Sequence, residues 1–245
     1  MKGMRSLSIV SELGRAPSRS YGKGGRRVHS AKAAVLALIG CAALLGGLVT
    51  ADAADRPVKI VALGDSLTAG YGLSRQDAFP AQLEKALKAK GIAVEIENAG
   101  VSGDTASGGL SRVDWSVGDG IDAVIVELGG NDMLRGVDHK VTRAALAAII
   151  ERLQARGIEV LLAGVRAAPN MGEDYVRGFD AIYPDLASKY GVVYHPFFLE
   201  GVAAQAKFAL QDGIHPNAAG VSRIVSSIMP KVEELIARVR AKRGS

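Results

Sequence analysis

The stretch Val58-Lys59-Ile60-Val61-Ala62-Leu63-Gly64-Asp65-Ser66-Leu67 joins a short apolar run to a glycine and two small polar side chains. An apolar run of this length, ended by glycine, predicts a buried β-strand. Ser66 then stands at the exit of that strand, where loops of parallel sheets carry their functional groups. The stretch therefore predicts the first strand of a sheet and a hydroxyl at its carboxyl end.

Working outward, short apolar runs alternate with longer amphipathic ones. The predicted strands are 58–63, 93–97, 123–127, 159–163 and 192–194, and the predicted helices are 79–90, 141–156, 175–190 and 218–240. Gly91, Gly157 and Gly191 each follow a predicted helix, where a left-handed cap favours glycine. Such alternation predicts one domain of the α/β class, with a parallel sheet covered by helices on both faces.

Residues 1–53 differ from the rest and predict an export leader, followed by one domain over residues 54–245. A basic stretch precedes a 17-residue apolar run, 33–49, and the small residues Ala51-Asp52-Ala53 follow it as in a signal-peptide cleavage site. We expect secretion across the inner membrane into the periplasm, and a retained N-terminal membrane anchor is the alternative. Arg26-Arg27 leaves twin-arginine export open, and Cys41 leaves a lipoprotein anchor open.

Charge and cysteine usage exclude several functions for the predicted domain. The leader holds eight Lys/Arg and two acidic residues, which leaves 22 basic and 23 acidic residues in 54–245, a net charge of −1. The domain therefore lacks the basic footprint of a nucleic-acid-binding protein. Cys41 is the only cysteine and lies in the leader, so we expect no disulfide and no cysteine-ligated metal in the processed chain.

Four further positions have structural interpretations. His139 and His195 lack metal-ligand spacing, and we expect neither to be catalytic. We expect Trp115 to serve in packing, and the basic tail 238–245 to be a frayed, solvated end. We expect Asp65 and Asp104 to form hydrogen bonds within their own turns rather than to bind a metal.

Polar clusters follow four of the predicted strands, and a fifth precedes the last helix. They are Gly64-Asp65-Ser66, 98–104, Gly129-Gly130-Asn131-Asp132, 166–172 and 212–215. The carboxyl ends of parallel strands meet at one edge of a sheet, where ligands bind. We therefore expect these five segments to converge.

Ser66, His215 and Asp212 are the parts of a nucleophilic hydrolase. A serine hydroxyl needs a base to take its proton, and an imidazole needs a carboxylate to fix its tautomer. The three-residue spacing of Asp212 and His215 can place that carboxylate beside the ring within one turn. The alternatives are that Ser66 caps a helix, that Asp212 is a turn residue and that His215 is a surface histidine.

Gly103 and Asn131 are candidate oxyanion donors. A tetrahedral oxyanion needs donors that are already in position. A glycine N–H in a tight turn permits close approach, and the Asn131 carboxamide donates without adding charge. The alternative is that 129–132 is a plain flexible turn.

Four segments together resemble the four blocks of the SGNH (GDSL) hydrolases, in the family's order. They are Gly64-Asp65-Ser66-Leu67, Ser102-Gly103-Asp104, Gly129-Gly130-Asn131-Asp132 and Asp212-Gly213-Ile214-His215-Pro216. Outside the blocks, the stretches 67–72, 103–105, 127–132 and 181–184 resemble bacterial periplasmic multifunctional esterases described as acyl-CoA thioesterase, arylesterase and lysophospholipase. The resemblance covers roughly 57–230. It implies a three-layer α/β/α sandwich with a mainly parallel five-stranded, flavodoxin-like sheet, and no metal or cofactor.

The resemblance also assigns roles by position. Ser66 is the nucleophile, His215 the base and Asp212 the group that orients it. The Ser66 N–H, the Gly103 N–H and the Asn131 side chain form the oxyanion hole. Substrate-binding positions are Met133 and Leu134, in a loop over the acyl chain, and Ala167 and Pro169 after the fourth strand. The family often has a bulkier apolar residue where Ala167-Ala168 stand, so chain-length preference is left open.

The sequence thus predicts a monomeric serine hydrolase of small acyl or aryl esters, thioesters or lysophospholipids, with no stable membrane insertion after processing. A carbohydrate O-acetylesterase is the alternative, although aromatic residues that stack on sugars make up only 5% of the chain. A flavin- or nucleotide-binding module is less consistent, since 64–68 lacks G-x-G-x-x-G spacing. A catalytically dead binding protein is also less consistent, since every required group is present.

Overall fold

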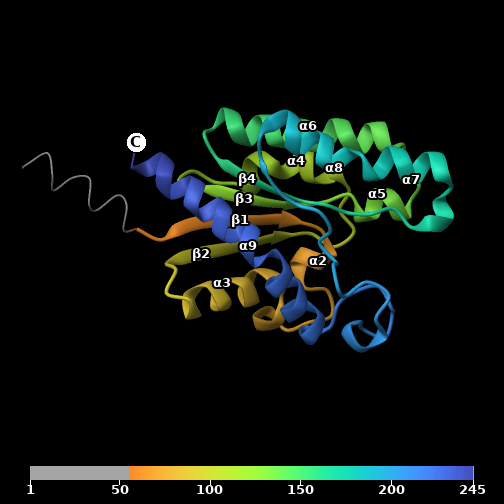
Figure 1. Cartoon of the computed structure of the whole chain (residues 1–245), viewed down its shortest axis with the longest axis horizontal. Helices are drawn as coiled ribbons and strands as arrows, with labels where there is room; N and C mark the ends of the chain where they lie inside the picture. Colours follow the sequence, from red (N-terminus) through yellow and green to blue (C-terminus); the bar gives the residue numbers. More distant parts are fainter. Residues whose placement is uncertain (1–55, 245) are drawn as a thin grey trace, which may run out of the picture. The chain divides into compact units, whose positions relative to one another are not determined.

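The computed structural model describes residues 56–244, which form a parallel sheet between two layers of helices (Figure 1). The strand order is β2-β1-β3-β4-β5, and each neighbouring pair is parallel. The strands are β1 Val58–Gly64, β2 Val94–Gly100, β3 Ala123–Glu127, β4 Glu159–Ala163 and β5 Val193–His195. The predicted α/β class, three layers and five strands are confirmed, with β2 three residues longer than expected at its carboxyl end.

Helices connect these strands. The α-helices are α2 Ser66–Ala69, α3 Phe79–Ala89, α4 Ala106–Ser116, α5 Gly130–Leu134, α6 His139–Ala155, α7 Glu173–Asp180, α8 Ile182–Tyr190 and α9 Ala218–Arg243. Short 3₁₀ turns are η1 Arg75–Asp77, η2 Pro169–Met171 and η3 Ala206–Phe208. The single helix expected over 175–190 is two helices, because Pro184 has no N–H to donate to the turn before it.

Helix α4 is absent from the sequence prediction for a physical reason. Its first turn contains Gly108 and Gly109, which lower helix propensity. A Cβ at Gly109 would lie 2.3 Å from a methyl carbon of Leu128, so glycine is needed there for close packing on β3's loop. Tertiary packing therefore decides this helix against its local propensity.

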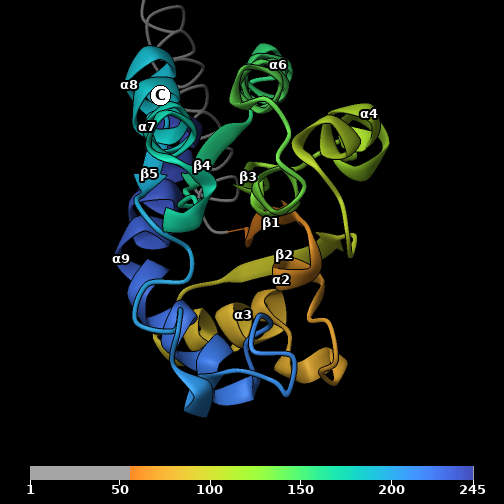
Figure 2. The same cartoon turned by 90° about the vertical axis from the view of Figure 1, so that its right-hand side faces the viewer.

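The sheet has a separate hydrophobic core on each face. Val61 and Leu63 of β1 pack with α4, α6 and α8, whereas Ile60 packs with α3 and α9. Figure 1 shows these two helix groups on opposite sides of the strands, and Figure 2 shows the same layers from the side. Every residue of β3 is buried, as its continuous apolar run predicts, whereas Val94 is the one buried residue of the edge strand β2.

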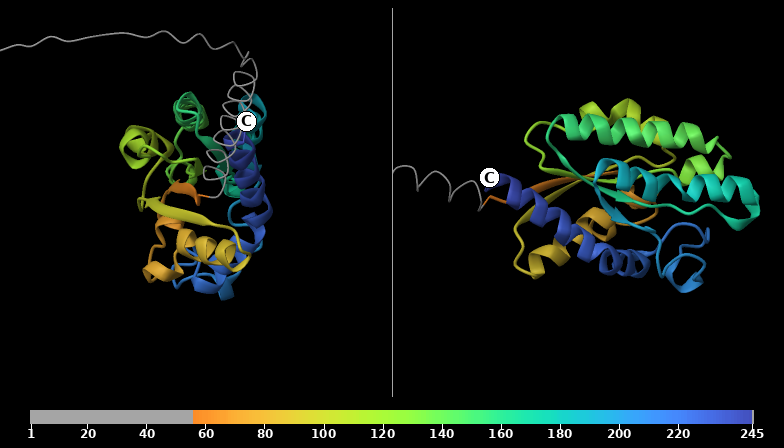
Figure 3. Two further views of the ribbon diagram at one scale, coloured as in Figure 1. Left: turned by 90° about the vertical axis from the view of Figure 1, so that its left-hand side faces the viewer. Right: turned by 45° about the horizontal axis from the view of Figure 1, so that its top comes forward.

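The expectation of a frayed basic tail is wrong for the residues up to 243. Helix α9 continues to Arg243, whose guanidinium donates to Asp122 Oδ2 at 2.6 Å and to the carbonyl oxygen of Arg56 at 2.9 Å. Arg238 donates to the carbonyl oxygen of Gly191 at 2.7 Å. Figure 3 shows this end of α9 beside the start of β1. These arginine side chains therefore anchor the end of the helix to the domain instead of extending into solvent.

Trp115 is also not the packing residue that we expected, because 73% of its surface is exposed. The buried stripe of α4 is formed by Ala106, Gly109, Arg112 and Val113, and Trp115 lies off this stripe. The expected leader, residues 1–53 with Cys41, lies outside the described residues. Within residues 56–244, no helix has the length and hydropathy that a bilayer span requires.

Candidate active site

Ser66 lies at the first position of α2, directly after β1. The Asp65 carboxylate caps this helix, since its Oδ1 accepts a hydrogen bond from the Leu67 N–H at 3.0 Å. The alternative that Ser66 itself is the capping residue is therefore wrong, and the expectation that Asp65 serves its own turn is confirmed. Gly64 is required at the bend, because a Cβ there would lie 2.0 Å from the Thr68 hydroxyl oxygen.

His215 bridges Ser66 and Asp212. Its Nδ1 lies 2.7 Å from Asp212 Oδ2, and its Nε2 lies 2.9 Å from Ser66 Oγ, across 149 positions of sequence. A carboxylate only accepts hydrogen bonds, so Nδ1 carries the proton and Nε2 faces the hydroxyl as an acceptor. The predicted meeting of the two ends of the chain is therefore observed.

The turn before α9 holds the Asp212 carboxylate in its ionised form. Asp212 Oδ1 accepts hydrogen bonds from the backbone N–H groups of His215 at 3.0 Å and of Ile214 at 2.9 Å. These bonds, first the one from His215, lower the pKa of Asp212 to about 2. The carboxylate that orients the imidazole is thus charged throughout the neutral range.

Two contacts that the sequence analysis missed fix the position of His215. The Leu210 N–H donates to the His215 carbonyl oxygen at 2.7 Å. The ring of Tyr71 packs on the imidazole with centroids 4.4 Å apart and a 35° tilt. Tyr71 lies close to Ser66 in the sequence, and this proximity could have pointed to a role for it, but the motif that contains Tyr71 does not assign one.

Of the candidate oxyanion donors, Asn131 lines the same cavity as Ser66, whereas Gly103 lies in the loop between β2 and α4. The Asn131 Nδ2 donates a hydrogen bond at 3.0 Å to Oδ2 of Asp65, the residue directly before Ser66. Gly103 has φ +84°, a conformation that favours glycine. Within residues 56–244, neither the Ser66 N–H nor the Gly103 N–H donates to a protein acceptor. Both are therefore available to a ligand.

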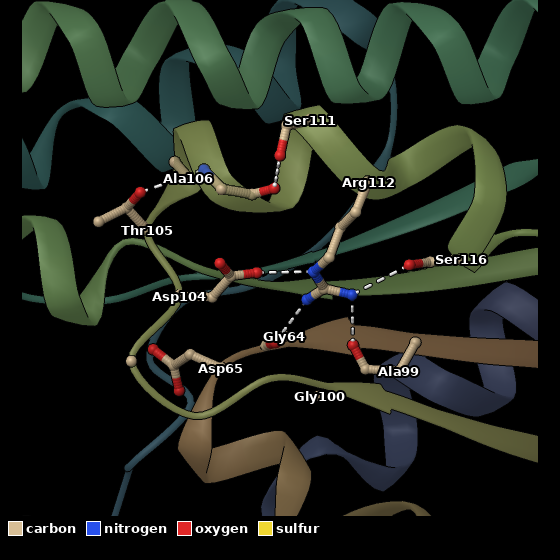
Figure 4. Close-up of polar contacts among 12 residues, drawn as sticks. Gly64, Asp65, Ala99, Gly100, Asp104, Thr105, Ala106, Ser111, Arg112 and Ser116 are labelled. Atoms are coloured by element: carbon tan, nitrogen blue, oxygen red, sulfur yellow. Dashed lines mark hydrogen bonds and ion pairs between the residues drawn. The ribbon is translucent and has the colours of Figure 1, made fainter.

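Arg112, a residue without a predicted role, joins three segments of this side of the site (Figure 4). It is 6% exposed and donates to Asp104 Oδ2 at 2.6 Å, to the carbonyl oxygen of Ala99 at 2.8 Å and to that of Gly64 at 2.9 Å. Asp104 thus pairs with Arg112 rather than with its own turn, contrary to expectation. The guanidinium fixes the carboxyl ends of β1 and β2 to the loop that contains Gly103.

Asp132 makes a second buried link. Its Oδ2 accepts from the Ala106 N–H at 2.8 Å, and its Oδ1 accepts from the Thr142 hydroxyl at 2.9 Å. The carboxylate is fully buried. It therefore ties the start of α4, just after the Gly103 loop, to α5, which carries Asn131.

A cavity of about 490 Å³ opens beside these groups. Ser66, His215 and Asn131 line it, and so do the predicted substrate-binding residues Met133, Leu134, Ala167 and Pro169. Met133 and Leu134 lie in helix α5 rather than in the expected loop, and Gly103 is not among the lining residues. A third wall, which no sequence pattern predicted, comes from Ile214 and from the segment after β5: Phe197, Phe198, Leu199, Ala203 and Ala204. No motif marks that segment, so only the fold reveals it.

The other titratable candidates lie away from the cavity. His195 is buried at the end of β5, where burial lowers its pKa, and His139 packs edge-on against Tyr175. In the part of the chain that the structure describes, no three His, Cys, Asp or Glu side chains gather in a metal-binding arrangement. Two larger open grooves flank α3, and none of the predicted catalytic residues lines them.

Comparisons with known proteins agree on one family. Residues 62–223 match the model of the GDSL-like lipase/acylhydrolase family. Esterase TesA of Pseudomonas aeruginosa is 37% identical over 202 residues, which cover 82% of this chain and 98% of that protein. Thioesterase 1/protease 1/lysophospholipase L1 of Escherichia coli K12 is 39% identical over 176 residues, covering 68% and 78%.

Solved structures give the same result. AlinE4, an SGNH-hydrolase family esterase, is 48% identical with a TM-score of 0.62, covering 73% of this chain and 96% of that one. A crystal structure of TesA is 35% identical with a TM-score of 0.69, covering 72% and 99%. An acetyl xylan esterase, AlAXEase, is 20% identical with a TM-score of 0.60, a likeness of fold alone.

Proposed function

Because the chain belongs to the GDSL-like lipase/acylhydrolase family, we propose that it cleaves carboxylic esters or thioesters through an acyl-enzyme on Ser66. The observation that carries this proposal is the His215 imidazole, 2.9 Å from Ser66 Oγ and 2.7 Å from Asp212 Oδ2. A hydroxyl, a base and a carboxylate in this order are the parts that activate a serine nucleophile.

The proposed reaction has two halves, acylation of Ser66 and hydrolysis of the acyl-enzyme, and His215 transfers protons in both. His215 Nε2 takes the proton of Ser66 Oγ as the oxygen attacks the carbonyl carbon, and the Asp212 carboxylate stabilises the imidazolium. The imidazolium then protonates the leaving alcohol or thiol, and the acyl group remains on Ser66. Water, deprotonated by His215, attacks the acyl-enzyme and releases the acid.

The oxyanion of both tetrahedral intermediates is assigned to the Ser66 N–H, the Gly103 N–H and the Asn131 carboxamide. Two backbone groups with no protein acceptor and a side chain anchored by Asp65 support this assignment. Donors that are fixed before the reaction stabilise developing charge without reorganising.

The cavity favours an acyl substrate over a sugar. Met133, Leu134, Ala167 and Pro169, with Phe197 and Phe198, offer apolar walls next to Ser66. Such walls suit acyl chains and aryl leaving groups, and relatives are named esterase, arylesterase and thioesterase/lysophospholipase. A carbohydrate O-acetylesterase remains the alternative, since it would use the same triad.

A substrate panel separates these two classes. Purified enzyme is assayed on p-nitrophenyl esters of C4 to C16 acids and on acetylated sugars, and we expect higher kcat/KM on the acyl series. Leu134→Ala removes part of the apolar wall, so KM for the longer esters should rise about fivefold, in line with about 1 kcal/mol of buried apolar surface. Val141→Ala, an exposed position outside the cavity, is the matched control. Preference for acetylated sugars would favour the alternative.

The site of action is assigned from the N-terminal 53 residues. Their basic stretch, apolar run and Ala51-Asp52-Ala53 support export to the periplasm with removal of the leader. N-terminal sequencing of the periplasmic fraction should find a start near residue 54. An intact Met1 on the exported protein would contradict processing.

Activity-based labelling tests the nucleophile. A fluorophosphonate probe should modify the wild-type protein once, on the peptide that contains Ser66, and should not modify Ser66→Ala. Modification of another serine, or none in a protein that hydrolyses p-nitrophenyl butyrate, would refute the assignment.

A further inference from the structure

Glu127, which the proposed mechanism does not use, lies directly under the site. It is the last residue of β3 and the register partner of Gly64, and it is fully buried. Its Oε2 accepts a hydrogen bond from the Thr68 hydroxyl at 2.8 Å. Its Oε1 has no hydrogen-bond donor among the described residues. A buried carboxyl oxygen without a partner is costly if it is charged.

Asp65, a second buried carboxyl, directly follows Gly64, the register partner of Glu127, so the two acidic side chains are neighbours at the end of β1 and β3. Both Asp65 oxygens accept hydrogen bonds, Oδ1 from the Leu67 N–H at 3.0 Å and Oδ2 from Asn131 Nδ2 at 3.0 Å. Two adjacent carboxylates cannot both remain ionised in a dry environment. One proton must therefore be held by the pair.

The hydrogen bonds place that proton on Glu127. Asp65 accepts hydrogen bonds from two N–H groups, one on each oxygen, and these favour its ionised form. Glu127 accepts only the Thr68 hydroxyl, on Oε2, and its Oε1 has no donor among the described residues. The nearby Tyr183 hydroxyl does not supply a donor, since it donates to the carbonyl oxygen of Leu128 at 2.9 Å. Burial, then the charge of Asp65, raises the pKa of Glu127 well above its usual value, while burial raises the pKa of Asp65 to about 6.

We propose that Glu127 keeps a proton on Oε1 and through it donates a hydrogen bond to the Asp65 carboxylate, which in turn holds the Asn131 carboxamide in the orientation that faces the oxyanion. Glu127 is thus a positioning residue that acts through Asp65. The oxyanion role of Asn131 rests on the proposed function; the proton on Glu127 does not.

This arrangement has two consequences for the reaction. With one Asn131 N–H engaged by Asp65, the amide cannot flip without presenting its oxygen to the carboxylate, so the second N–H stays available to substrate. A neutral Glu127 also leaves one negative charge rather than two near the developing oxyanion. Fewer like charges there mean less repulsion in the transition state.

A pair of substitutions tests the proton donor through activity. Gln presents an N–H₂ donor and a carbonyl acceptor, so Glu127→Gln reproduces the protonated acid; we expect kcat within about threefold of wild type. Glu127→Met has neither, and we expect kcat to fall about 10- to 100-fold with KM nearly unchanged, approaching the loss of an oxyanion donor. Glu95→Gln, on exposed β2, controls for the exchange itself. Equal losses in Glu127→Gln and Glu127→Met would overturn the proposal.

Infrared spectroscopy reads the proton directly and needs no activity. At pH 7 the wild type should show the carbonyl band of a protonated carboxylic acid, which Glu127→Gln lacks and Glu95→Gln keeps. Absence of that band in the wild type would overturn the proposal, even if Glu127→Met fails to fold. If the band is present but fluorophosphonate does not label wild-type Ser66, the proposed function fails while the carboxyl pair stands.

Discussion

The base side and the oxyanion side of the site are built differently. The base side is a short exposed turn in which Asp212 and His215 have 36% and 19% of their side-chain surface exposed. The oxyanion side rests on charged groups taken out of solvent; in the Arg112–Asp104 ion pair the corresponding values are 7% and 16%. Turn geometry holds one side, and long-range buried polar contacts hold the other.

This difference shows where the two sides are vulnerable. The contacts of Asp212 span two or three residues, so they form whenever the turn forms. Those of Arg112, Asp132 and Asp65 span up to 66 residues and exist only in the folded domain. We therefore expect substitutions on the base side to affect chemistry alone, and those under the oxyanion side to affect stability as well.

Removal of the base should have the largest effect. His215→Ala leaves the Ser66 hydroxyl without a proton acceptor, so kcat should fall about 10⁴- to 10⁶-fold. The melting temperature should stay within a few degrees of wild type, because the ring is held from outside the core. Steady-state kinetics and calorimetry on one preparation check both; a variant that lost its fold would break the comparison.

The Asn131 side chain comes next. Asn131→Ala removes one oxyanion donor, which is expected to lower kcat about 10²- to 10³-fold with little change in KM. It also leaves Asp65 Oδ2 without its N–H donor, so some loss of stability should accompany it. A kcat within threefold of wild type would take Asn131 out of the oxyanion hole.

The buried carboxyl pair makes the stability of the oxyanion side depend on pH above about 4.5. A carboxyl whose folded pKa is raised binds a proton that the unfolded chain has released, so stability falls as pH rises above the unfolded value. Glu127→Gln abolishes this titration. As pH rises from about 4.5, the free energy of unfolding of the variant should therefore increase relative to that of the wild type, by at most about 1.4 kcal/mol per pH unit.

Urea denaturation of both proteins between pH 4.5 and pH 8 measures this difference. Parallel curves over the whole interval would contradict a raised pKa for Glu127. The Asp212 pKa of about 2 adds no change in this interval, because that carboxyl titrates below it.

The smallest expected effect sharpens the role of Arg112. Arg112→Lys keeps the charge but cannot reach Asp104 and the carbonyl oxygens of Ala99 and Gly64 together. We expect the free energy of unfolding to fall by about 1.5–3 kcal/mol. Arg152→Lys, in the exposed pair with Asp114, should stay within about 0.5 kcal/mol. Equal changes in the two variants would show that the buried guanidinium is not special.

The same contrast explains how much the sequence could predict. The β3 and β4 bounds and the His215–Asp212 pair follow from local patterns, apolar runs and a three-residue turn. Helix α4 could not be predicted, because packing of Gly109 on Leu128 decides it. The role of Arg112 could not either, because its acceptors are backbone carbonyls, which every residue has.

The 197–204 wall of the cavity and the exposed Trp115 illustrate the remaining limit. Phe197 and Phe198 carry no motif, and only the order of β4 and β5 in the sheet brings them to the cavity. Trp115 is apolar enough to predict burial, but the face of α4 on which it lies was unknown without the helix. Side-chain direction depends on elements that the sequence pattern did not reveal.

The most direct measurement is to trap the acyl-enzyme during turnover. Wild-type protein reacting with p-nitrophenyl butyrate is quenched in acid and digested, and the peptides are weighed by mass spectrometry. The account predicts a butyryl group on the peptide that contains Ser66, and none in Ser66→Ala, whose turnover should be lower by several powers of ten. A butyryl group on another residue, or near-wild-type turnover by Ser66→Ala, would contradict it.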